Sequence, residues 1–278
     1  MLRYLRLTRL YVQKAIKGML TYRWSFLINC ISQALDYAVT FLLMWIMIVK
    51  DVSFSVEAGE LVGFIGENGA GKSTTLKMMS GILYPTSGDI QVSGICPYRQ
   101  REKNAQNIGV VFGQRSRLNW DLPMADSFDL YREIYRIDSR IFRKNVALFV
   151  EMLHMQDFYD TPVRQLSLGQ RMKAEVALAL LHEPPILYLD EPTIGLDVMA
   201  KQQIREFIVE RNRREATTTI LTSHDMKDLA YICRRIIVLA KGSVLFDGSM
   251  EAFRQTYAKD DAMDMEDMVR EIYEEEKA

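Results

Sequence analysis

The chain has 278 residues, 49% of them hydrophobic, which is enough for one large domain or two small ones with a buried core. Its 35 basic and 36 acidic residues leave a net charge of −1, so the charge balance gives no reason to expect nucleic acid as a partner. Three widely separated cysteines, Cys30, Cys96 and Cys233, form no CxxC pair and predict neither a disulfide framework nor a zinc site.

The first 49 residues have the composition of membrane-associated helices. Residues 1–20 alternate apolar and basic side chains in a roughly helical period, which predicts a basic amphipathic helix on a membrane surface. Residues 26–49 carry one charge, and they are long enough to cross about 30 Å of hydrocarbon. Their polar residues follow one stripe of a helix: Asn29, Gln33, Asp36 and Thr40. An amphipathic helix packed on a soluble core is the alternative to this membrane helix.

A phosphate-binding loop follows a short apolar run. Residues 61–65 (LVGFI) predict a buried strand, and GENGAGKST after them matches the pattern GxxxxGK[ST] ahead of a helical segment. In this pattern backbone N–H groups bind phosphate, Lys72 reaches the β- and γ-phosphate oxygens, and Ser73 offers its hydroxyl to Mg²⁺. The predicted ATP-binding residues are Gly66, Glu67, Asn68, Gly69, Ala70, Gly71, Lys72, Ser73 and Thr74.

A second apolar strand ends in two carboxylates. The stretch ILYLDEP (186–192) places Asp190 at the carboxyl end of a strand, where α/β sheets bind their ligands, and Glu191 comes next. We expect Asp190 to hold Mg²⁺ through water and Glu191 to act as general base for the attacking water. Upstream, Ser167 precedes a long helical segment, and taken alone it predicts only a helix N-cap.

The order of these motifs resembles the ATP-binding subunits of ABC transporters. LSLGQ lies between the phosphate loop and LYLDEP, and the order and spacing of the motifs match the family over residues 50 to 250. VVFGQRSRLNWDLP, LSLGQRMKAE and DEPTIGLDVMAK are similar to ATPase subunits of bacterial exporters whose permease is a separate polypeptide. The resemblance implies an α/β fold: a P-loop NTPase core with a mostly parallel sheet and an ABC-type helical subdomain at about 115–165.

The resemblance also implies roles for individual residues in a head-to-tail dimer. The signature of one subunit would contact the γ-phosphate bound by the other, through Ser167, Leu168, Gly169 and Gln170. Leu168 stands where the family commonly has glycine, and we expect the contact to survive. Gln114 would couple the Mg²⁺ site to the helical subdomain, His224 would steady the γ-phosphate, and Asp197 would link the two ATP sites. The implied catalytic set is Glu191, His224, Gln114 and Lys72, and the implied metal set is Ser73, Gln114 and Asp190.

These inferences predict three parts and one function. Residues 1–49 form the membrane-associated helices, 50–258 the ABC ATPase domain and 259–278 an acidic C-terminal helix. The predicted function is the ATP- and Mg²⁺-dependent energy subunit of an ABC transporter, an exporter, bound as a homodimer to a permease at the cytoplasmic face of the cell membrane. A truncated or fused nucleotide-binding remnant, with a regulatory role or without efficient hydrolysis, stays an alternative. A soluble ABC ATPase of DNA repair or translation is disfavoured, since the paired domains, coiled-coil insertions or zinc modules of such chains are not present.

The junction near residue 49 raises a further hypothesis. Relatives normally carry one or two strands and an adenine-stacking aromatic residue about two dozen positions before the phosphate loop, and here those positions fall in the apolar run. Tyr37 and Trp45 are the aromatic residues near that distance. Basic residues before the run would keep the N-terminus inside and send the ATPase across the membrane, so a simple single span is disfavoured. Since residues 1–49 resemble the start of an exporter permease, we hypothesise that two neighbouring polypeptides were joined, with material lost at the seam.

Overall fold

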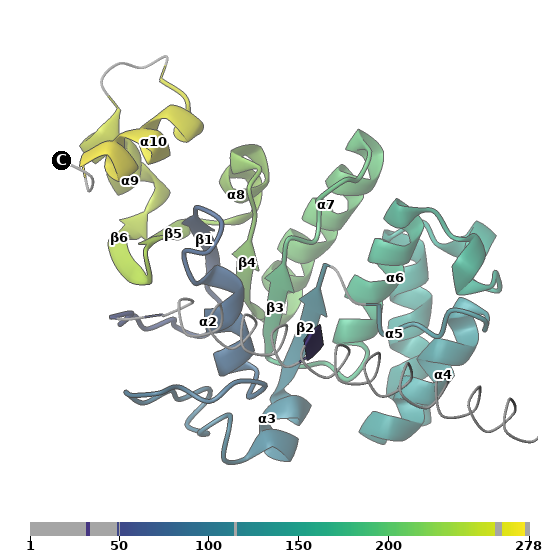
Figure 1. Cartoon of the computed structure of the whole chain (residues 1–278). Helices are drawn as coiled ribbons and strands as arrows, with labels where there is room; N and C mark the ends of the chain where they lie inside the picture. The colour runs from purple at the N-terminus through teal and green to yellow at the C-terminus, as the bar shows by residue number, and fades with distance from the viewer. Residues whose placement is uncertain (1–31, 34–48, 50, 114–115, 259–262, 276–278) are drawn as a thin grey trace, which may run out of the picture. The chain divides into compact units, whose positions relative to one another are not determined.

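A computed structural model describes residues 32–33, 49, 51–113, 116–258 and 263–275 of the chain (Figure 1). The chain divides into two units, Met1–Ile48 and Val49–Ala278, and the fold belongs to the second. The helices predicted in residues 1–49 lie outside the described residues except for Ser32, Gln33 and Val49, and so do Tyr37, Trp45 and Gln114. In the described ranges, no helix has the length and apolar character needed to cross a membrane. The predicted domain boundaries stay predictions.

A mostly parallel sheet forms the centre of the second unit. Among the described residues its order is β2-β3-β4-β1-β5-β6, with every neighbouring pair parallel except β5 and β6. The strands are β1 (Leu61–Gly66), β2 (Ile108–Phe112), β3 (Ile186–Asp190), β4 (Thr218–Thr222), β5 (Arg235–Ala240) and β6 (Ser243–Ser249). This arrangement confirms the predicted α/β fold with a mostly parallel sheet.

The strands β1, β3 and β5 are buried on both faces, which explains why they read as continuous apolar runs. Side chains of a strand point alternately to opposite faces. In β1, Val62 and Phe64 join one hydrophobic cluster, whereas Leu61 and Ile65 join the other. All six residues of β1 are buried, so the start of the loop that follows this strand is held firmly in place.

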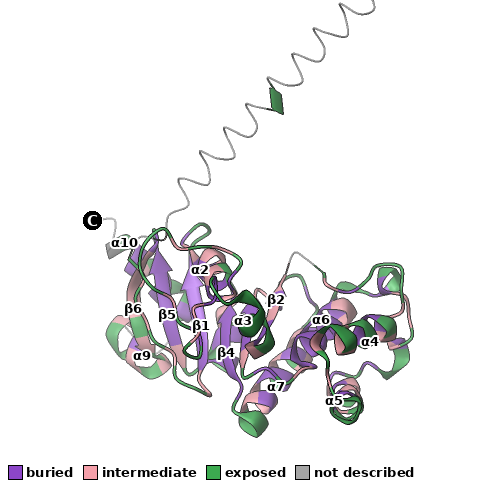
Figure 2. Cartoon of the chain, turned by 90° about the horizontal axis from the view of Figure 1, so that it is seen from below, coloured by how far each residue is buried: buried purple, intermediate pink, exposed green. Residues whose placement is uncertain are grey.

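Helices cover the two faces (Figures 1 and 2). Helix α2 packs on one face, and α6, α7, α8 and α9 pack on the other, while α4 and α5 lie beyond the β2 edge. The helices are α2 (Lys72–Met79), α3 (Arg101–Asn107), α4 (Met124–Tyr135), α5 (Ser139–Met152), α6 (Leu168–Leu180), α7 (Val198–Glu215), α8 (Met226–Ile232), α9 (Met250–Tyr257) and α10 (Met265–Glu275), with short 3₁₀ turns at Gln156–Phe158 and Val163–Gln165.

One glycine brings α6 against the sheet. A Cβ atom added at Gly109 in β2 would lie 2.4 Å from the carbonyl oxygen of Ala179 in α6. No real Cβ tolerates that distance to backbone, so only glycine permits this approach of helix and strand. The contact fixes the carboxyl half of α6 on the sheet.

The described residues before β1 contain no strand, only an isolated bridge between Asp51 and Ser243. The segment is nevertheless packed: Val52, Phe54 and Val56 are partly buried against the cluster on the α2 face. The Phe54 ring meets the Phe64 ring edge to face, with 5.3 Å between centroids. The alternation of half-buried and exposed residues here is that of an extended strand without a ladder partner among the described residues.

Candidate nucleotide-binding site

The phosphate-binding loop lies between β1 and α2. Gly69 and Gly71 adopt left-handed backbone angles, with φ of 85° and 108°, which suit glycine. A Cβ atom at Gly66 would lie 2.6 Å from the carbonyl oxygen of Leu239, so the end of β1 also requires glycine. Gly71 is the N-cap residue of α2 and has no capping side chain, which leaves the helix N-terminus open for a phosphate.

Lys72 folds back into the loop. Its Nζ donates to the carbonyl oxygen of Gly66 and, at 3.1 Å, to that of Glu67, and the side chain is buried. Burial lowers the pKa of the Lys72 ammonium, while the carboxylates of Glu191 and Asp190 oppose that shift. An ammonium held by the carbonyl groups of the loop has the position and charge to bind an incoming phosphate.

The carboxylate of Asp190 connects α2 with two strands. Its Oδ1 accepts from the Ser73 hydroxyl at 2.9 Å and from the Thr222 hydroxyl at 2.7 Å. Ser73 lies in the first turn of the helix after the phosphate loop, and Thr222 ends β4, the strand beside β3. The hydroxyl and the carboxylate predicted to bind a metal therefore lie together, and Thr222 fixes the orientation of the carboxylate.

Glu191 adopts a left-handed backbone conformation, with φ of 55°, unusual for a residue other than glycine. Its N–H donates to the carbonyl and the hydroxyl oxygen of Thr222, each at 3.1 Å. Its carboxylate contacts the His224 ring at hydrogen-bond distance, with 2.7 Å between Glu191 Oε1 and His224 Nε2. The structure thus brings the predicted base and the predicted phosphate-sensing histidine into direct contact, at a strained backbone position of the kind found in functional sites.

A buried carboxylate that the motifs did not reveal holds the segments around Glu191 and His224. Asp228 in α8 is fully buried and accepts from the hydroxyl of Thr193 and from Nη2 of Arg205. The Ser223 hydroxyl lies 3.5 Å from the same carboxylate. Because Thr193 is two residues after Glu191 and Ser223 immediately precedes His224, this carboxylate fastens the two loops to each other.

The signature residues lie at the start of α6. Ser167 is the N-cap: its hydroxyl accepts from the N–H of Gln170 at 3.2 Å, and the Gln170 side chain accepts from the N–H of Ser167 at 2.9 Å. The predicted N-cap role of Ser167 is therefore confirmed, and the serine lies on an exposed helix end. A Cβ atom at Gly169 would lie 2.9 Å from Ala200, so the start of α6 packs tightly on the start of α7.

The unusual Leu168 contacts the next motif. A Cβ atom at Gly195 would lie 3.2 Å from Leu168 Cδ2, which places the leucine side chain against the turn that leads to Asp197. Asp197 caps α7 by accepting from the N–H of Ala200 at 2.9 Å. In one chain the signature and the turn before Asp197 are therefore neighbours, an arrangement that the sequence alone did not predict.

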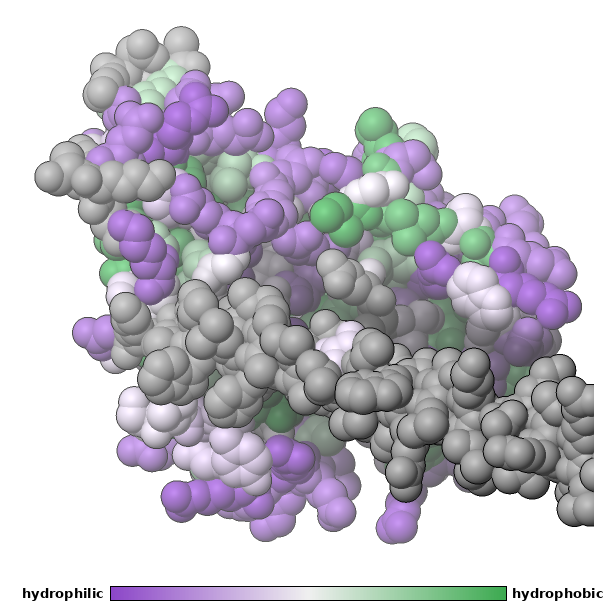
Figure 3. Space-filling view, in the orientation of Figure 1, coloured by the Kyte–Doolittle hydropathy of each residue, from purple (hydrophilic) through white to green (hydrophobic). Residues whose placement is uncertain are grey.

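Apolar side chains are exposed around these two helix ends. The exposed fractions are 41% for Leu168, 54% for Ile194, 79% for Val198 and 63% for Met199. Figure 3 shows hydrophobic surface over the upper ends of α6 and α7. A contiguous apolar rim beside polar signature residues is typical of a surface that another protein covers.

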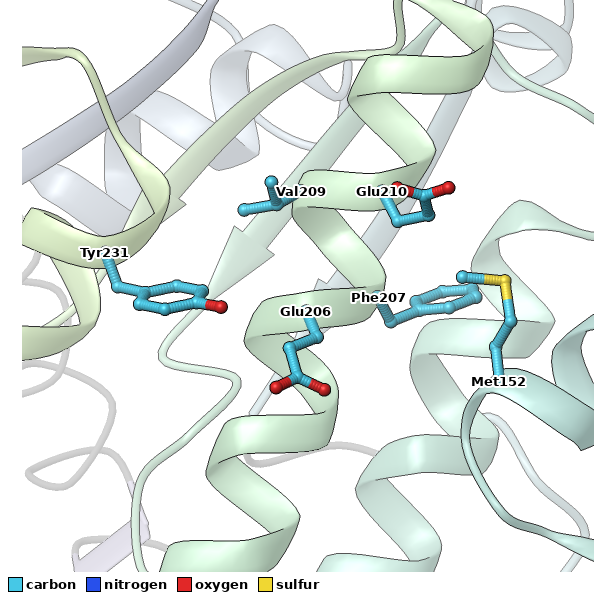
Figure 4. A pocket seen from close by; sticks show the side chains of 6 residues that line it. All are labelled: Met152, Glu206, Phe207, Val209, Glu210 and Tyr231. Carbon is cyan, nitrogen blue, oxygen red and sulfur yellow. The ribbon is translucent and has the colours of Figure 1, made fainter.

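A hollow of about 370 Å³ lies away from these motifs. It lies between α5, α7 and α8 and is lined by Met152, Glu206, Phe207, Val209, Glu210 and Tyr231 (Figure 4). The Glu210 carboxylate is already paired with Arg213 and Arg214. None of the predicted site residues lines this hollow, so it is not the candidate nucleotide site.

The predicted residues fall into two groups in the described structure. Lys72, Ser73, Asp190, Glu191 and His224 lie in one connected cluster. The signature and Asp197 form a separate cluster at the ends of α6 and α7. The motif search missed Thr222 and Asp228. Thr222 carries no local signal, because its contact with Asp190 depends on β4 lying beside β3.

Comparison with known proteins places the chain among ATP-binding proteins. Residues 49–194 match the family model described as ABC transporter. The ABC transporter ATP-binding protein NatA of Bacillus subtilis is 33% identical over 213 residues, 77% of this chain and 86% of that protein. The Nod factor export ATP-binding protein I of Burkholderia orbicola is 33% identical over 207 residues, 74% of this chain and 67% of that protein. A solved dimeric ATP-binding cassette in a post-hydrolysis state with ADP and Pi superposes with a TM-score of 0.65 at 27% identity, covering 72% of this chain and 90% of that one.

Proposed function

This chain belongs to the ABC transporter family of ATP-binding proteins and is an ATPase of that family, and from this premise we propose that it energises an exporter. The observation that carries the hydrolytic part of this proposal is the connected cluster of Ser73, Asp190, Glu191 and His224 next to Lys72. Each member has a neighbour that orients it. A cluster so ordered suits hydrolysis better than passive nucleotide binding.

The donor set suits Mg²⁺ together with ATP. The Ser73 hydroxyl and the Asp190 carboxylate are oxygen ligands, which Mg²⁺ prefers, and they lie 2.9 Å apart. In the described part of the chain no group of three or more His, Cys, Asp or Glu side chains could hold a metal by itself. Phosphate oxygens would therefore complete the coordination, as is usual for Mg²⁺ in phosphoryl transfer. Bound there, the ion would neutralise charge that develops on the phosphates.

Glu191 is proposed as the general base. Its carboxylate adjoins Asp190 at the carboxyl edge of the sheet, and its backbone is fixed by two bonds to Thr222. The contact with His224 leaves the second carboxylate oxygen without a bond to this histidine, so it can accept a proton from water. His224 in turn holds the carboxylate in position, and we propose that its N–H turns to a γ-phosphate oxygen once ATP is bound.

We propose that two copies close head to tail over ATP. The apolar rim formed by Leu168, Ile194, Val198 and Met199 is a surface that such a dimer would bury. The related cassette with ADP and Pi is itself dimeric, which supports this proposal. In the closed dimer, Ser167 and the N–H of Gly169 would donate to the γ-phosphate held by the other copy, helped by the N-terminus of α6.

The partner proposed for this dimer is an exporter permease at the cytoplasmic face of the cell membrane. The support is the word export in the name of the Burkholderia relative and the similarity of the signature region to exporter subunits. Gln114 is proposed to couple the metal site to the helices that meet the permease.

The test is Mg²⁺-dependent ATP hydrolysis by the detergent-solubilised full chain. The parent should hydrolyse ATP, and Glu191→Gln should lower kcat by about 100-fold or more, since a positioned base contributes roughly 10²–10⁴-fold. The variant should still bind ATP and accumulate as a dimer in size-exclusion chromatography.

Glu210→Gln is the matched control. It also replaces a carboxylate that has a bonded partner, but Glu210 lies on α7 and lines the hollow of Figure 4, away from the candidate site. It should hydrolyse ATP like the parent. Hydrolysis by Glu191→Gln at the parental rate would refute the assignment of the base, and a parent without activity would favour the nucleotide-binding remnant instead.

A further inference from the structure

A buried carboxylate on α6 binds three consecutive residues that follow β2. Glu175, in the middle of the helix that begins with the signature, is only 4% exposed. Its Oε1 accepts from the Ser116 hydroxyl at 2.6 Å, from the Arg117 N–H at 2.7 Å and from the Leu118 N–H at 3.3 Å. Three donors on one oxygen form a site that holds an anion firmly.

Arg117 supplies the charge that balances this carboxylate. Its Nε donates to Glu175 Oε2 at 3.3 Å, and its Nη2 donates to the Glu175 carbonyl oxygen at 3.2 Å. The guanidinium also lies over the Tyr131 ring, 5.8 Å from its centroid. A buried carboxylate that lost these partners would be strongly unfavourable, so residues 116–118 and α6 are held together as one body.

Three residues before Ser116, the chain is also anchored to β3, the strand that ends in Asp190. The Gly113 N–H donates to the carbonyl oxygen of Asp190 at 3.0 Å. A Cβ atom at Gly113 would lie 3.0 Å from that oxygen and 3.2 Å from the carbonyl oxygen of Glu191. Gly113 is therefore attached to the end of β3 beside Glu191, and residues 116–118 are attached to Glu175 on the signature helix.

Next to the two anchors a cavity separates part of α6 from the end of β2. A cavity of about 170 Å³ is lined by Phe112 and Gly113 on the strand side, by Ser116, and by Leu168, Arg171 and Glu175 on the helix side. Close packing cannot set a distance across open space. Across this cavity, the hydrogen bonds of Glu175 link this part of α6 to the chain that follows β2.

We propose that Glu175 is a positioning residue for ATP hydrolysis. By holding residues 116–118 it links the amino half of α6, which carries Ser167 and Gly169, to the chain that follows β2 and so to Asp190 and Glu191. The inference rests on the proposed function, because the orientation of the signature matters only if it contacts ATP. A displacement of about 1 Å in a reacting geometry costs on the order of 100-fold in rate.

The test compares Glu175→Ala, Glu175→Gln and Ser116→Ala in the full chain. Glu175→Ala should lower kcat by about 100-fold while the affinity of a single subunit for a fluorescent ATP analogue stays within about 2-fold, because the phosphate loop is untouched. In a Glu191→Gln background it should also abolish the ATP-dependent dimer. Glu175→Gln keeps an oxygen for the three donors and should recover at least about a tenth of parental kcat.

Ser116→Ala tests the same link with a smaller change. It removes the 2.6 Å donor and should lower kcat by about 5-fold, the effect of one ordinary hydrogen bond, without changing nucleotide affinity. Combining it with Glu175→Ala should cause no further loss, because both changes break one contact. If Glu175→Ala does not fold, the Ser116→Ala result decides.

Glu210→Gln serves as control, since its carboxylate also has arginine partners, at 2.5 to 2.9 Å, but both of them lie on its own helix, α7. Unchanged kcat in a folded Glu175→Ala, or in Ser116→Ala, would overturn the inference, and so would equal losses of hydrolysis and single-subunit binding. An active parent with unaffected variants overturns this inference alone. An inactive parent overturns the proposed function and this inference with it.

Discussion

The interior contact of His182 predicts how stability depends on pH. His182 lies between α6 and β3, and its Nε2 donates to the carbonyl oxygen of Ile108 at 3.2 Å. Its ring stacks on Tyr135 with 4.1 Å between centroids, while its buried Nδ1 has no hydrogen-bond partner within the described residues. Protonation would place an N–H⁺ group where nothing accepts it. Burial accordingly lowers the pKa of His182 from 6.5 to about 4.

This lowered pKa makes acid destabilising. Between pH 6.5 and 4 the unfolded chain binds a proton at this residue that the folded chain does not bind, so the free energy of unfolding falls as the pH falls. With pKa values of about 4 and 6.5, the loss relative to pH 7.5 is about 2.5 kcal/mol at pH 4.5, and it approaches at most about 3.5 kcal/mol below pH 4.

The perturbation is His182→Gln, whose side-chain amide can still donate to Ile108. Urea unfolding followed by circular dichroism at pH 7.5, 5.5 and 4.5 gives the free energy of unfolding of parent and variant. At pH 7.5 the parent should be the more stable, since it keeps the stacking on Tyr135. By pH 4.5 the parent should lose about 2.5 kcal/mol relative to the variant. The control is His154→Asn at an exposed histidine, which should follow the parent at every pH.

A gap between parent and His182→Gln that stays constant within about 0.5 kcal/mol from pH 7.5 to 4.5 would refute the reasoning. It would mean that His182 accepts its proton in the folded state without cost.

Three further variants probe the loop, the signature and the helix packing. Lys72→Ala should weaken ATP binding by at least about 10-fold, because a buried ammonium beside the phosphates is lost. Equilibrium binding of a fluorescent nucleotide measures this affinity. An affinity equal to that of the parent would show that Lys72 does not bind the phosphates. Ser167→Arg should leave single-subunit binding unchanged and block hydrolysis, since the signature acts across the dimer; an unaffected rate would count against head-to-tail closure. Gly109→Ala should lower the free energy of unfolding by about 1–3 kcal/mol in urea titrations, because its Cβ meets the Ala179 carbonyl oxygen at 2.4 Å; unchanged stability would show that α6 can shift freely.

Local patterns in the sequence were sufficient for the parts of the site that lie within one strand–loop–helix unit. The apolar run, the glycines and Lys72–Ser73 predict a phosphate loop because each residue's role depends on its immediate neighbours. The same holds for Asp190 and Glu191 at the end of an apolar strand, and for Ser167 as an N-cap. Gln114 and the predicted membrane-associated helix stay predictions, since they lie outside the described residues.

The relations between segments were decided only by the tertiary structure. That β4 lies beside β3, so that Thr222 meets both Asp190 and Glu191, follows from the strand order and from no local pattern. Asp228 and Glu175 read as ordinary helix residues in the sequence, because a surface carboxylate and a buried, bonded one are the same letter. Their partners are distant in the chain and are brought close by packing of the helices on the sheet. The sequence by itself therefore determined which chemistry the chain carries, and the fold determined which residues hold that chemistry in place.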